Sequence, residues 1–366
     1  MKSKRIQLFI AVLIGILCLY FFARKMNWKE LLTALQQANY GYVIIAILLQ
    51  YVAMWLRALR WQSFLGTPWV SVSKLFLIAN IGFMGNGVFP ARLGELIRPF
   101  LVWQKTQHTF PTALATIVVE RVFDLLVILL ILAFSLSMLP VQSTPASASL
   151  AELTTETGVE IAIPADSRDW IQDLGYLGAL VFLALLSAML FMTYAPNWSY
   201  NLAARIFRPL PEKVSVKLLE AIRAFEQGAS TFRRPASFLF SFLITVILWV
   251  VIAYSELIIL WAFGVNHVGI IGGLFLMTGL CFAVMFPQLP GYIGVYQFAV
   301  VAILSNTFAV DESVAGAIAI VMWLTQVPPI ILMGFICLMI LGVSFSEITH
   351  VQEEIPVSED KPQQVT

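Results

Sequence analysis

The chain has 366 residues, of which 60% are hydrophobic and 12% are charged. Soluble domains carry about 45–50% apolar and about 25% charged residues, so this composition excludes an ordinary soluble protein and indicates a polytopic membrane protein. The formal net charge of +1 gives no general attraction to nucleic acid. The three cysteines lie inside apolar runs and the three histidines lie far apart. The sequence therefore predicts no metal site, no disulfide framework and no cofactor.

Apolar runs long enough to cross a bilayer core, which takes about 20 residues, recur along the chain. They cover residues 6–23, 41–60, 112–140, 174–194, 236–263 and 313–343. The first follows a basic N-terminus, as a secretory signal does. Because Arg24 and Lys25 follow it in place of a small-residue cleavage site, we expect a retained helix. Two further apolar regions, 74–106 and 268–308, are interrupted near their middle by proline and glycine.

The charges of the loops predict the orientation. Segment 141–173 carries six acidic residues and one arginine, whereas segment 195–235 carries seven basic residues and three glutamates. Because Lys and Arg favour the cytoplasmic side, we expect the basic segment and both termini in the cytoplasm. The acidic loop then lies outside, and the interrupted regions enter the cytoplasmic (inner) membrane of the cell from opposite faces.

A short internal repeat relates the two interrupted regions. The segments Phe89-Pro90-Ala91-Arg92-Leu93-Gly94 and Phe286-Pro287-Gln288-Leu289-Pro290-Gly291 share the frame Phe-Pro-x-x-x-Gly. The same displacement superposes 41–60 on 238–257 and 112–140 on 309–337. The sequence therefore predicts an all-α membrane protein with about six long helices and two broken hairpins, arranged as an inverted repeat. Its halves are 1–140 and 174–345, with the acidic outer loop 141–173 between them and a polar cytoplasmic tail, 346–366.

Inverted repeats with matching Pro/Gly-broken segments are typical of alternating-access transporters, whose site lies between the broken elements. Of the two predicted half-repeats, the first one, 1–140, carries the charged residues of the candidate site. The candidate ligands of a lipid phosphate are Arg92, Arg98 and Arg121, and the candidate charge-pairing or proton-coupling residues are Glu95, Glu120 and Asp124. An arginine fork binds phosphate through two parallel hydrogen bonds, and a half-helix N-terminus adds a positive dipole. Two structural alternatives remain. The segment from Arg92 to Arg98 could form the cytoplasmic rim of a shallow hairpin, with its charges reaching the lipid headgroups. The charges around Glu120 could form a buried ion-pair network with a purely structural role.

The backbone of the two hairpins supplies a second set of candidates. These residues are Asn86, Pro90, Gly94, Pro287, Pro290, Gly291 and Gly294. In the second hairpin they expose backbone N–H groups to a cavity, or they form a kink that neighbouring helices satisfy. Glu256 and Gln297 are weaker candidates. Glu256 lies near the outer end of its span, and we expect it to be an interfacial or helix-packing residue.

Three motifs resemble the transmembrane domain family of lysylphosphatidylglycerol synthases, also called flippase-like domains. They are Asn86 with the run from Phe89 to Arg98, Glu120-Arg121-Val122-Phe123-Asp124, and the run from Pro287 to Tyr296. The resemblance covers about residues 5–345. It implies lipid handling without lysyl transfer, because the chain has no room for the transferase domain. Tyr292 and Gln297 depart from the family pattern, which has Gly and often Glu there, so the resemblance does not imply proton coupling through this hairpin.

The leading hypothesis is therefore a flippase or transporter for an anionic or aminoacylated lipid. One alternative is a membrane enzyme acting on a lipid-linked glycan, hopanoid or phospholipid, although no catalytic motif is recognisable. The other is an accessory subunit of a lipid-biosynthetic membrane enzyme. The expected partners are membrane lipids and not nucleic acid, and the sequence leaves the lipid, the direction of transport and the oligomeric state open.

Overall fold

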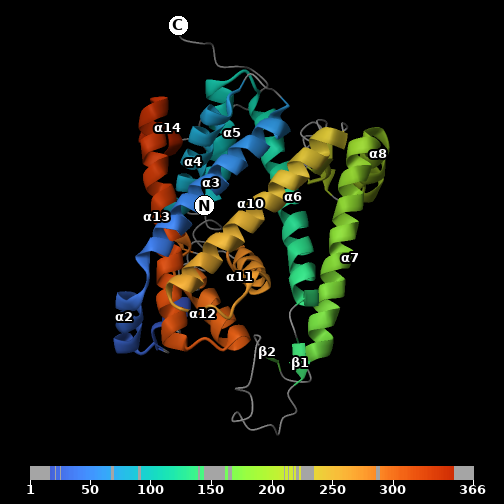
Figure 1. Cartoon of the computed structure of the whole chain (residues 1–366). Coiled ribbons are helices and arrows are strands. Elements are labelled where there is room, and N and C mark those ends of the chain that lie inside the picture. The colour runs from blue at the N-terminus through green and yellow to red at the C-terminus, as the bar shows by residue number, and fades with distance from the viewer. Residues whose placement is uncertain are drawn as a thin grey trace. The chain divides into compact units, whose positions relative to one another are not determined.

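The structure is a computed structural model, and it is helical apart from two short strands (Figure 1). It describes residues 17–20, 22–24, 26–66, 70–89, 92–138, 141–143, 161–163, 167–209, 211–212, 214–216, 218–219, 222–223, 235–285 and 289–349. The first predicted run, 6–23, lies mostly outside these residues, as do Pro90 and Pro287 and most of the polar tail.

The elements follow the apolar runs of the sequence. In chain order they are α2 (Trp28–Gln37), α3 (Tyr40–Leu65), α4 (Val72–Val88), α5 (Gly94–Lys105), α6 (Phe110–Met138), β1 (Val141–Ser143), β2 (Ile161–Ile163), α7 (Ser167–Tyr194), α8 (Pro196–Phe207), α10 (Pro235–Ala262), α11 (Ile270–Ala283), the 3-10 turn η3 (Pro290–Tyr292), α12 (Val295–Phe308), α13 (Glu312–Leu341) and α14 (Phe345–Thr349). The strands form a parallel pair in which Val141 is opposite Ile161.

Four helical segments are long and apolar enough to span a membrane: 40–65, 236–262, 290–308 and 312–341. The helices at 180–194 and 196–207 count as a fifth if they form one span, with a bend of 118° between them. Helix α6 has 29 residues and carries Glu120, Arg121 and Asp124 near its middle. The four or five candidate spans are fewer than the eight or so apolar regions expected from the sequence, so that number stays a prediction.

Both interrupted regions consist of two helices joined by a break, as the Pro/Gly pattern predicts (Figure 1). The arms of the first hairpin, α4 and α5, have 17 and 12 residues. At about 1.5 Å per residue, neither arm reaches the thickness of a bilayer core, about 30 Å. The 12 residues of α5 are too few for a spanning helix, whereas the 17 residues of α4 are at the lower end of the range of about 17–25 residues.

Glycines allow the arms of the first hairpin to touch. A Cβ atom on Gly94 would overlap the carbonyl oxygen of Gly82, and a Cβ on Gly82 would overlap the side chain of Arg98. Small residues at a helix contact let two backbones approach closely. The crossing of α4 and α5 thus depends on Gly82 and Gly94, and it places the stem of Arg98 against α4.

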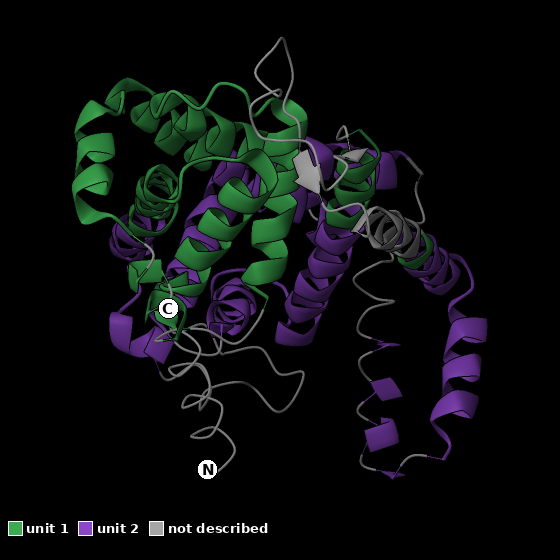
Figure 2. Cartoon of the chain, turned by 90° about the horizontal axis from the view of Figure 1, so that it is seen from below, with its two compact units in different colours: residues 1–52, 128–181, 249–329 green, residues 53–127, 182–248, 330–366 purple. Residues whose placement is uncertain are grey.

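The chain forms two compact units, each with its own apolar core (Figure 2). Unit 1 comprises residues 1–52, 128–181 and 249–329, and unit 2 comprises 53–127, 182–248 and 330–366. Trp61, Phe100 and Phe123 are among the largest fully buried side chains of unit 2. The unit 1 core includes Leu276 and Val300 of the second hairpin. Each unit contains one broken hairpin and takes segments from both predicted half-repeats.

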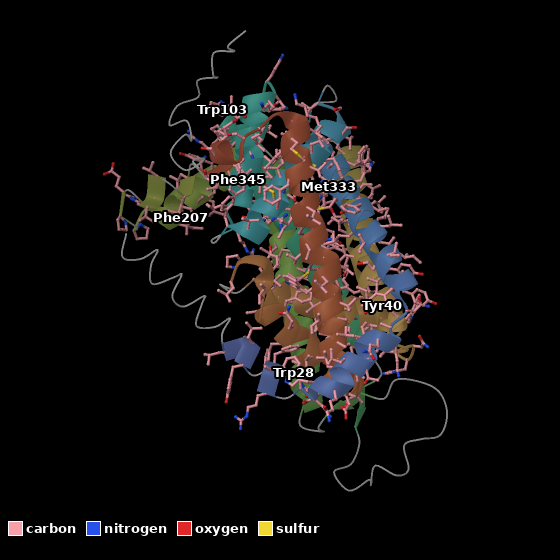
Figure 3. The ribbon with its side chains drawn as sticks, turned by 90° about the vertical axis from the view of Figure 1, so that its left-hand side faces the viewer. Trp28, Tyr40, Trp103, Phe207, Met333 and Phe345 are labelled. Carbon is pink, nitrogen blue, oxygen red and sulfur yellow. The ribbon has the colours of Figure 1, made fainter. Side chains whose placement is uncertain are left out.

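Exposed apolar side chains form a stripe along α3. Tyr40, Ile44, Leu48, Val52 and Trp55 follow helical spacing, and each is between 45% and 60% exposed. Tyr40 begins the stripe and points away from the ribbon (Figure 3). A stripe of this kind on a helix of 26 residues is suited to lipid contact, with tyrosine and tryptophan as interfacial anchors.

Candidate functional site

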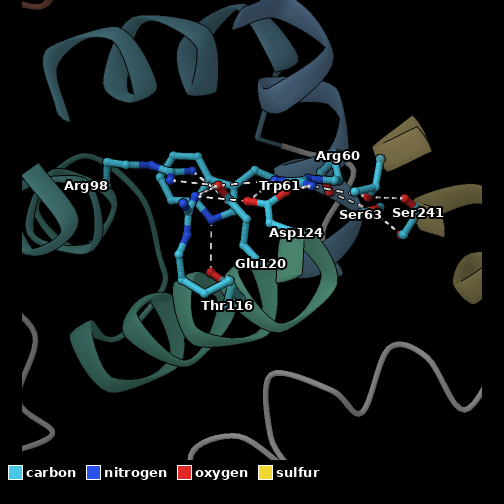
Figure 4. A network of polar contacts seen from close by, with 10 residues as sticks. Arg60, Trp61, Ser63, Arg98, Thr116, Glu120, Asp124 and Ser241 are labelled. Atoms are coloured by element: carbon cyan, nitrogen blue, oxygen red, sulfur yellow. Dashed lines mark hydrogen bonds and ion pairs between the residues drawn. The ribbon is translucent and has the colours of Figure 1, made fainter. Parts of the chain in front are cut away.

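A network of charged side chains lies buried in unit 2 (Figure 4). Its members come from three helices: Arg60 from α3, Arg98 from α5, and Glu120, Arg121 and Asp124 from α6. These five residues are called the ion-pair cluster. Arg60 and Glu120 are fully buried, and Arg98 and Asp124 are less than 5% exposed.

Glu120 is the centre of the cluster. Its Oε1 accepts from Nη1 of Arg98 at 3.1 Å, and its Oε2 accepts from Nη2 of the same guanidinium at 2.8 Å. Oε1 also lies 2.7 Å from Nη2 of Arg121 and 3.3 Å from Nη2 of Arg60. Three guanidinium groups therefore share one carboxylate, which is fixed from several directions.

Asp124 is held by two of the same arginines. Its Oδ1 lies 2.5 Å from Nη1 of Arg60, and its Oδ2 lies 3.3 Å from Nη2 of that residue. Nη2 of Arg121 is 3.2 Å from Oδ2, which makes an i,i+3 ion pair on α6. Nη1 of Arg60 also donates to Oγ1 of Thr245 on α10 at 3.1 Å.

Aromatic rings line the cluster. The guanidinium of Arg98 lies 4.2 Å from the ring centroid of Trp61, a cation–π distance. The indole N–H of Trp61 donates to Oγ1 of Thr116 at 2.9 Å, which fixes the ring (Figure 4). Arg57, one turn before Arg60 on α3, is 5.1 Å above the ring of Phe83. These contacts hold cationic groups in an apolar surrounding.

Positive charge is in excess in this part of unit 2. Arg57 and the three arginines of the cluster surround two buried carboxylates, and Glu95 is a further electrostatic neighbour of Arg121. With Glu95 counted as well, these described residues still carry one more positive than negative charge. The side chain of Arg121 is 39% exposed, whereas those of Arg60, Arg98 and Glu120 are at most 3% exposed. Arg121 is therefore the cation of the cluster that an anion reaches most easily.

The model of the family described as "Lysylphosphatidylglycerol synthase TM region" matches residues 8–334. The chain belongs to the lysylphosphatidylglycerol synthase TM family. It is a membrane protein of that family, and the resemblance inferred from the three motifs is confirmed.

Three curated relatives extend the comparison. The chain is 24% identical over 329 residues to "Glycosyltransferase AglD" of Haloferax volcanii, an alignment that covers 87% of this chain and 52% of that protein. The chain thus spans about half the length of this relative. Two "UPF0104 membrane protein" relatives from Methanothermobacter thermautotrophicus are each 22% identical, over 353 and 335 residues. These alignments cover 92% and 87% of the chain and 96% and 88% of the relatives.

Within this family member, the predicted phosphate ligands have different surroundings. Arg92 is exposed on the turn before α5 and has a positive φ of 53°. Arg98 is 2% exposed on α5, so its side chain is enclosed by protein. Glu95 is half-buried in the first turn of α5. Asn86 is half-buried near the end of α4, beside Gly94, and its Oδ1 has no hydrogen-bond partner among the described residues.

The second hairpin has a strained break in unit 1. Gly291, Tyr292 and Gly294 have φ values of 71°, 64° and 89°. The carbonyl oxygen of Gly291 accepts from Nε1 of Trp323 at 2.6 Å. Oε1 of Gln297 accepts from the N–H of Gly294 at 2.8 Å, so Gln297 caps the start of α12. A glutamate oxygen could accept the same bond.

Glu256 is buried in unit 1, at 2% exposure, and not at an exposed interface. Nε2 of Gln326 on α13 donates to its Oε1 at 3.3 Å. Of the two expectations for Glu256, the structure therefore favours helix packing. Among the described residues, no group of three or more His, Cys, Asp or Glu could hold a metal ion.

The sequence alone does not identify Arg60 as a member of the site. Arg57 and Arg60 end an apolar run, and the rule for cytoplasmic loops accounts for arginines at such a place without further assumptions. The available signal was their i,i+3 spacing, which puts both on one face of α3. Two arginines on one face of α3 could have been matched with the two carboxylates, Glu120 and Asp124, on one face of α6.

Proposed function

We propose that the protein is a lipid transporter that moves a phosphate-bearing lipid between the leaflets of the cytoplasmic membrane. The observation that carries this proposal is the excess of buried arginine charge in unit 2, with Arg121 partly exposed at its edge. The phosphate of the headgroup binds Arg121 first, and the acyl chains remain in the bilayer.

The energetics of buried charge support a functional cluster. Insertion scales put a charged side chain at the centre of a transmembrane helix at about 2.5–3.5 kcal/mol. Replacing a buried ion-pair network by apolar side chains of similar volume is often neutral or stabilising, so packing alone does not require one. A network with more cations than carboxylates is suited to a transient anion. A phosphate neutralises the excess charge and competes with Glu120 for the fork of Arg98.

The two broken hairpins are the elements that we propose to move during alternating access. Support comes from the shared Phe-Pro-x-x-x-Gly frame and from the presence of one broken hairpin in each unit. Pro/Gly-broken segments in corresponding halves are the usual binding elements of inverted-repeat transporters. In this proposal the first hairpin carries the charge through Arg98, and the second hairpin contributes backbone geometry through Gly291 and Gly294.

The test is leaflet exchange of fluorescent lipids in vesicles that contain the purified protein. Phosphatidylglycerol and aminoacyl-phosphatidylglycerol are compared with diacylglycerol carrying the same fluorophore on a chain, corrected for its spontaneous exchange. We expect the protein to accelerate exchange of the lipids with phosphate and not that of diacylglycerol. Folded protein that accelerates none of them, with and without a proton gradient, would overturn the proposal.

A second candidate is an accessory subunit or enzyme of lipid-linked glycan synthesis. It is favoured by the alignment with about half of the relative named glycosyltransferase AglD. Co-purification of this chain with one membrane glycosyltransferase at fixed stoichiometry, together with lack of lipid exchange, would support this candidate over transport. Exchange by the isolated chain would exclude an exclusively accessory role.

A further inference from the structure

A second buried carboxyl group, Glu256, lies in unit 1 with surroundings unlike those of Glu120. Its side chain is on α10 and is 2% exposed. Oε1 accepts one hydrogen bond, from Nε2 of Gln326 at 3.3 Å. Oε2 is buried and has no hydrogen-bond partner among the described residues. One oxygen of the carboxyl group is therefore held and the other is not.

The contrast with Glu120 indicates the charge state. Glu120 has three arginines within 3.3 Å, whereas Glu256 forms no ion pair with any residue that the structure describes. Moving an isolated carboxylate into an apolar surrounding is so unfavourable that the group takes up a proton instead. Ionisable residues are rare within membrane-spanning helices for the same reason. The surroundings of Glu256 thus favour the neutral acid.

The neighbours of Glu256 are polar but uncharged. Tyr296 on α12 is an electrostatic neighbour of Glu256, Cys281 on α11 is in turn a neighbour of Tyr296, and Gln326 on α13 donates to Glu256. Tyr296 is 4% exposed, and its hydroxyl group has no hydrogen-bond partner among the described residues. Tyr296 stands two residues after Gly294, so the break of the second hairpin lies next to this group.

We propose that Glu256 is a proton-binding site in the second hairpin's unit, with the proton on Oε2 and Oε1 held by Gln326. Deprotonation breaks the Oε2–H bond and transfers the proton to water. The carboxylate that remains has no cation to compensate it. The site therefore keeps its proton while dry and releases it when the hairpin admits water. Coupling of this release to lipid movement rests on the proposed transport function.

Infrared spectroscopy in vesicles tests the proton site without any transport. At neutral pH we expect a carbonyl stretching band of a protonated carboxylic acid that shifts in deuterated water. This band should be lost in Glu256→Gln. It should remain in the matched control Glu347→Gln, which changes a carboxylate outside the membrane-spanning segments. A band that persists unchanged in folded Glu256→Gln would overturn the proposal.

A second variant covers the case in which Glu256→Gln does not fold. Gln326→Leu removes the hydrogen bond to Oε1, so the acid band should move to higher frequency while the fold is kept. An unchanged band frequency would contradict the assignment. For coupling, an imposed proton gradient should alter lipid exchange by wild type and not by Glu256→Gln. If wild-type exchange ignores the gradient while the acid band is present, coupling is wrong and the proton site stands.

Discussion

Arg98 and Glu120 form a two-point ion pair in which Nη1 and Nη2 of the guanidinium lie 3.1 and 2.8 Å from Oε1 and Oε2. The two residues are 22 positions apart and belong to the broken hairpin and to α6. This pair fixes the arm of the hairpin that carries Arg98 to the next helix. Any movement of α5 relative to α6 has to break it or exchange the carboxylate for another anion, which is how a phosphate could be linked to movement of the hairpin.

Neutralising Glu120 should strongly destabilise the protein. Glu120→Gln leaves three arginines around an uncharged amide, and breaking a buried pair costs about 3–5 kcal/mol. The measurement is the free energy of unfolding in detergent or lipid. The double variant Arg98→Gln and Glu120→Gln should recover part of the loss. Equal stability of Glu120→Gln and wild type would contradict the charge assignment of the cluster.

A methyl group at the crossing of the first hairpin should separate its arms. The Cβ of Gly94→Ala would overlap the backbone carbonyl of Gly82, which cannot move as a flexible side chain does. We expect a loss of stability at the upper end of the overpacking range, about 1–3 kcal/mol. The control is Gly269→Ala, because a Cβ at Gly269 meets no atom within 4 Å. Similar melting temperatures for both variants would mean that the crossing is looser than described.

The cap of α12 should tolerate glutamate and not alanine. Gln297→Ala leaves the buried N–H of Gly294 without its acceptor, which should cost about 1–3 kcal/mol. Gln297→Glu keeps an acceptor oxygen at the same place, and a negative charge suits a helix N-terminus. Hydrogen exchange of the amides from Gly294 to Gln297 measures the effect. Fast exchange in both variants would show that the side-chain oxygen is not what protects this turn.

Acid should loosen α14 before it affects the buried cluster. The backbone N–H of Ser344 donates to Glu347 and lowers the pKa of that carboxyl, and the side chain of Gln104 adds a second hydrogen bond. Because the folded pKa is lowered, the stabilisation is complete above the ordinary glutamate pKa, about 4.3. It is lost as pH falls through the lowered value. Hydrogen exchange of α14 against pH checks this, and Glu347→Gln should remove the pH dependence.

The sequence alone was enough to predict the class of protein from its composition and the helix breaks from its prolines and glycines. An apolar fraction of 60% indicates a membrane protein, and proline with glycine near residues 90 and 290 predicts the two breaks. Arg98, Glu120 and Asp124 could be recognised because charges inside apolar helices are rare and costly. Their pairing with Arg60 could not, because it depends on how α3 passes α6.

Arg92 and Arg98 show that a single sequence does not reveal which of two neighbouring arginines is buried. Both belong to one short basic motif, and the sequence treats them alike. Helix α5 begins only at Gly94, so Arg92 lies outside the helix and is exposed, while Arg98 lies on its buried face with Ile97 and Leu101. The close approach of Gly82 to Gly94 is likewise invisible in a single sequence, because it depends on the crossing of two arms.

Leaflet exchange by Arg121→Ala is the most direct test of phosphate binding at the cluster. Glu120 and Asp124 keep Arg60 as a partner in this variant, and Glu120 also keeps Arg98, so the fold should survive. The matched control is Arg205→Ala, which removes an exposed arginine of α8 outside the cluster. We predict that Arg121→Ala loses at least about tenfold in exchange of phosphate-bearing lipids, corresponding to about 1.4 kcal/mol, while Arg205→Ala exchanges at the wild-type rate. Wild-type exchange by folded Arg121→Ala would contradict the account.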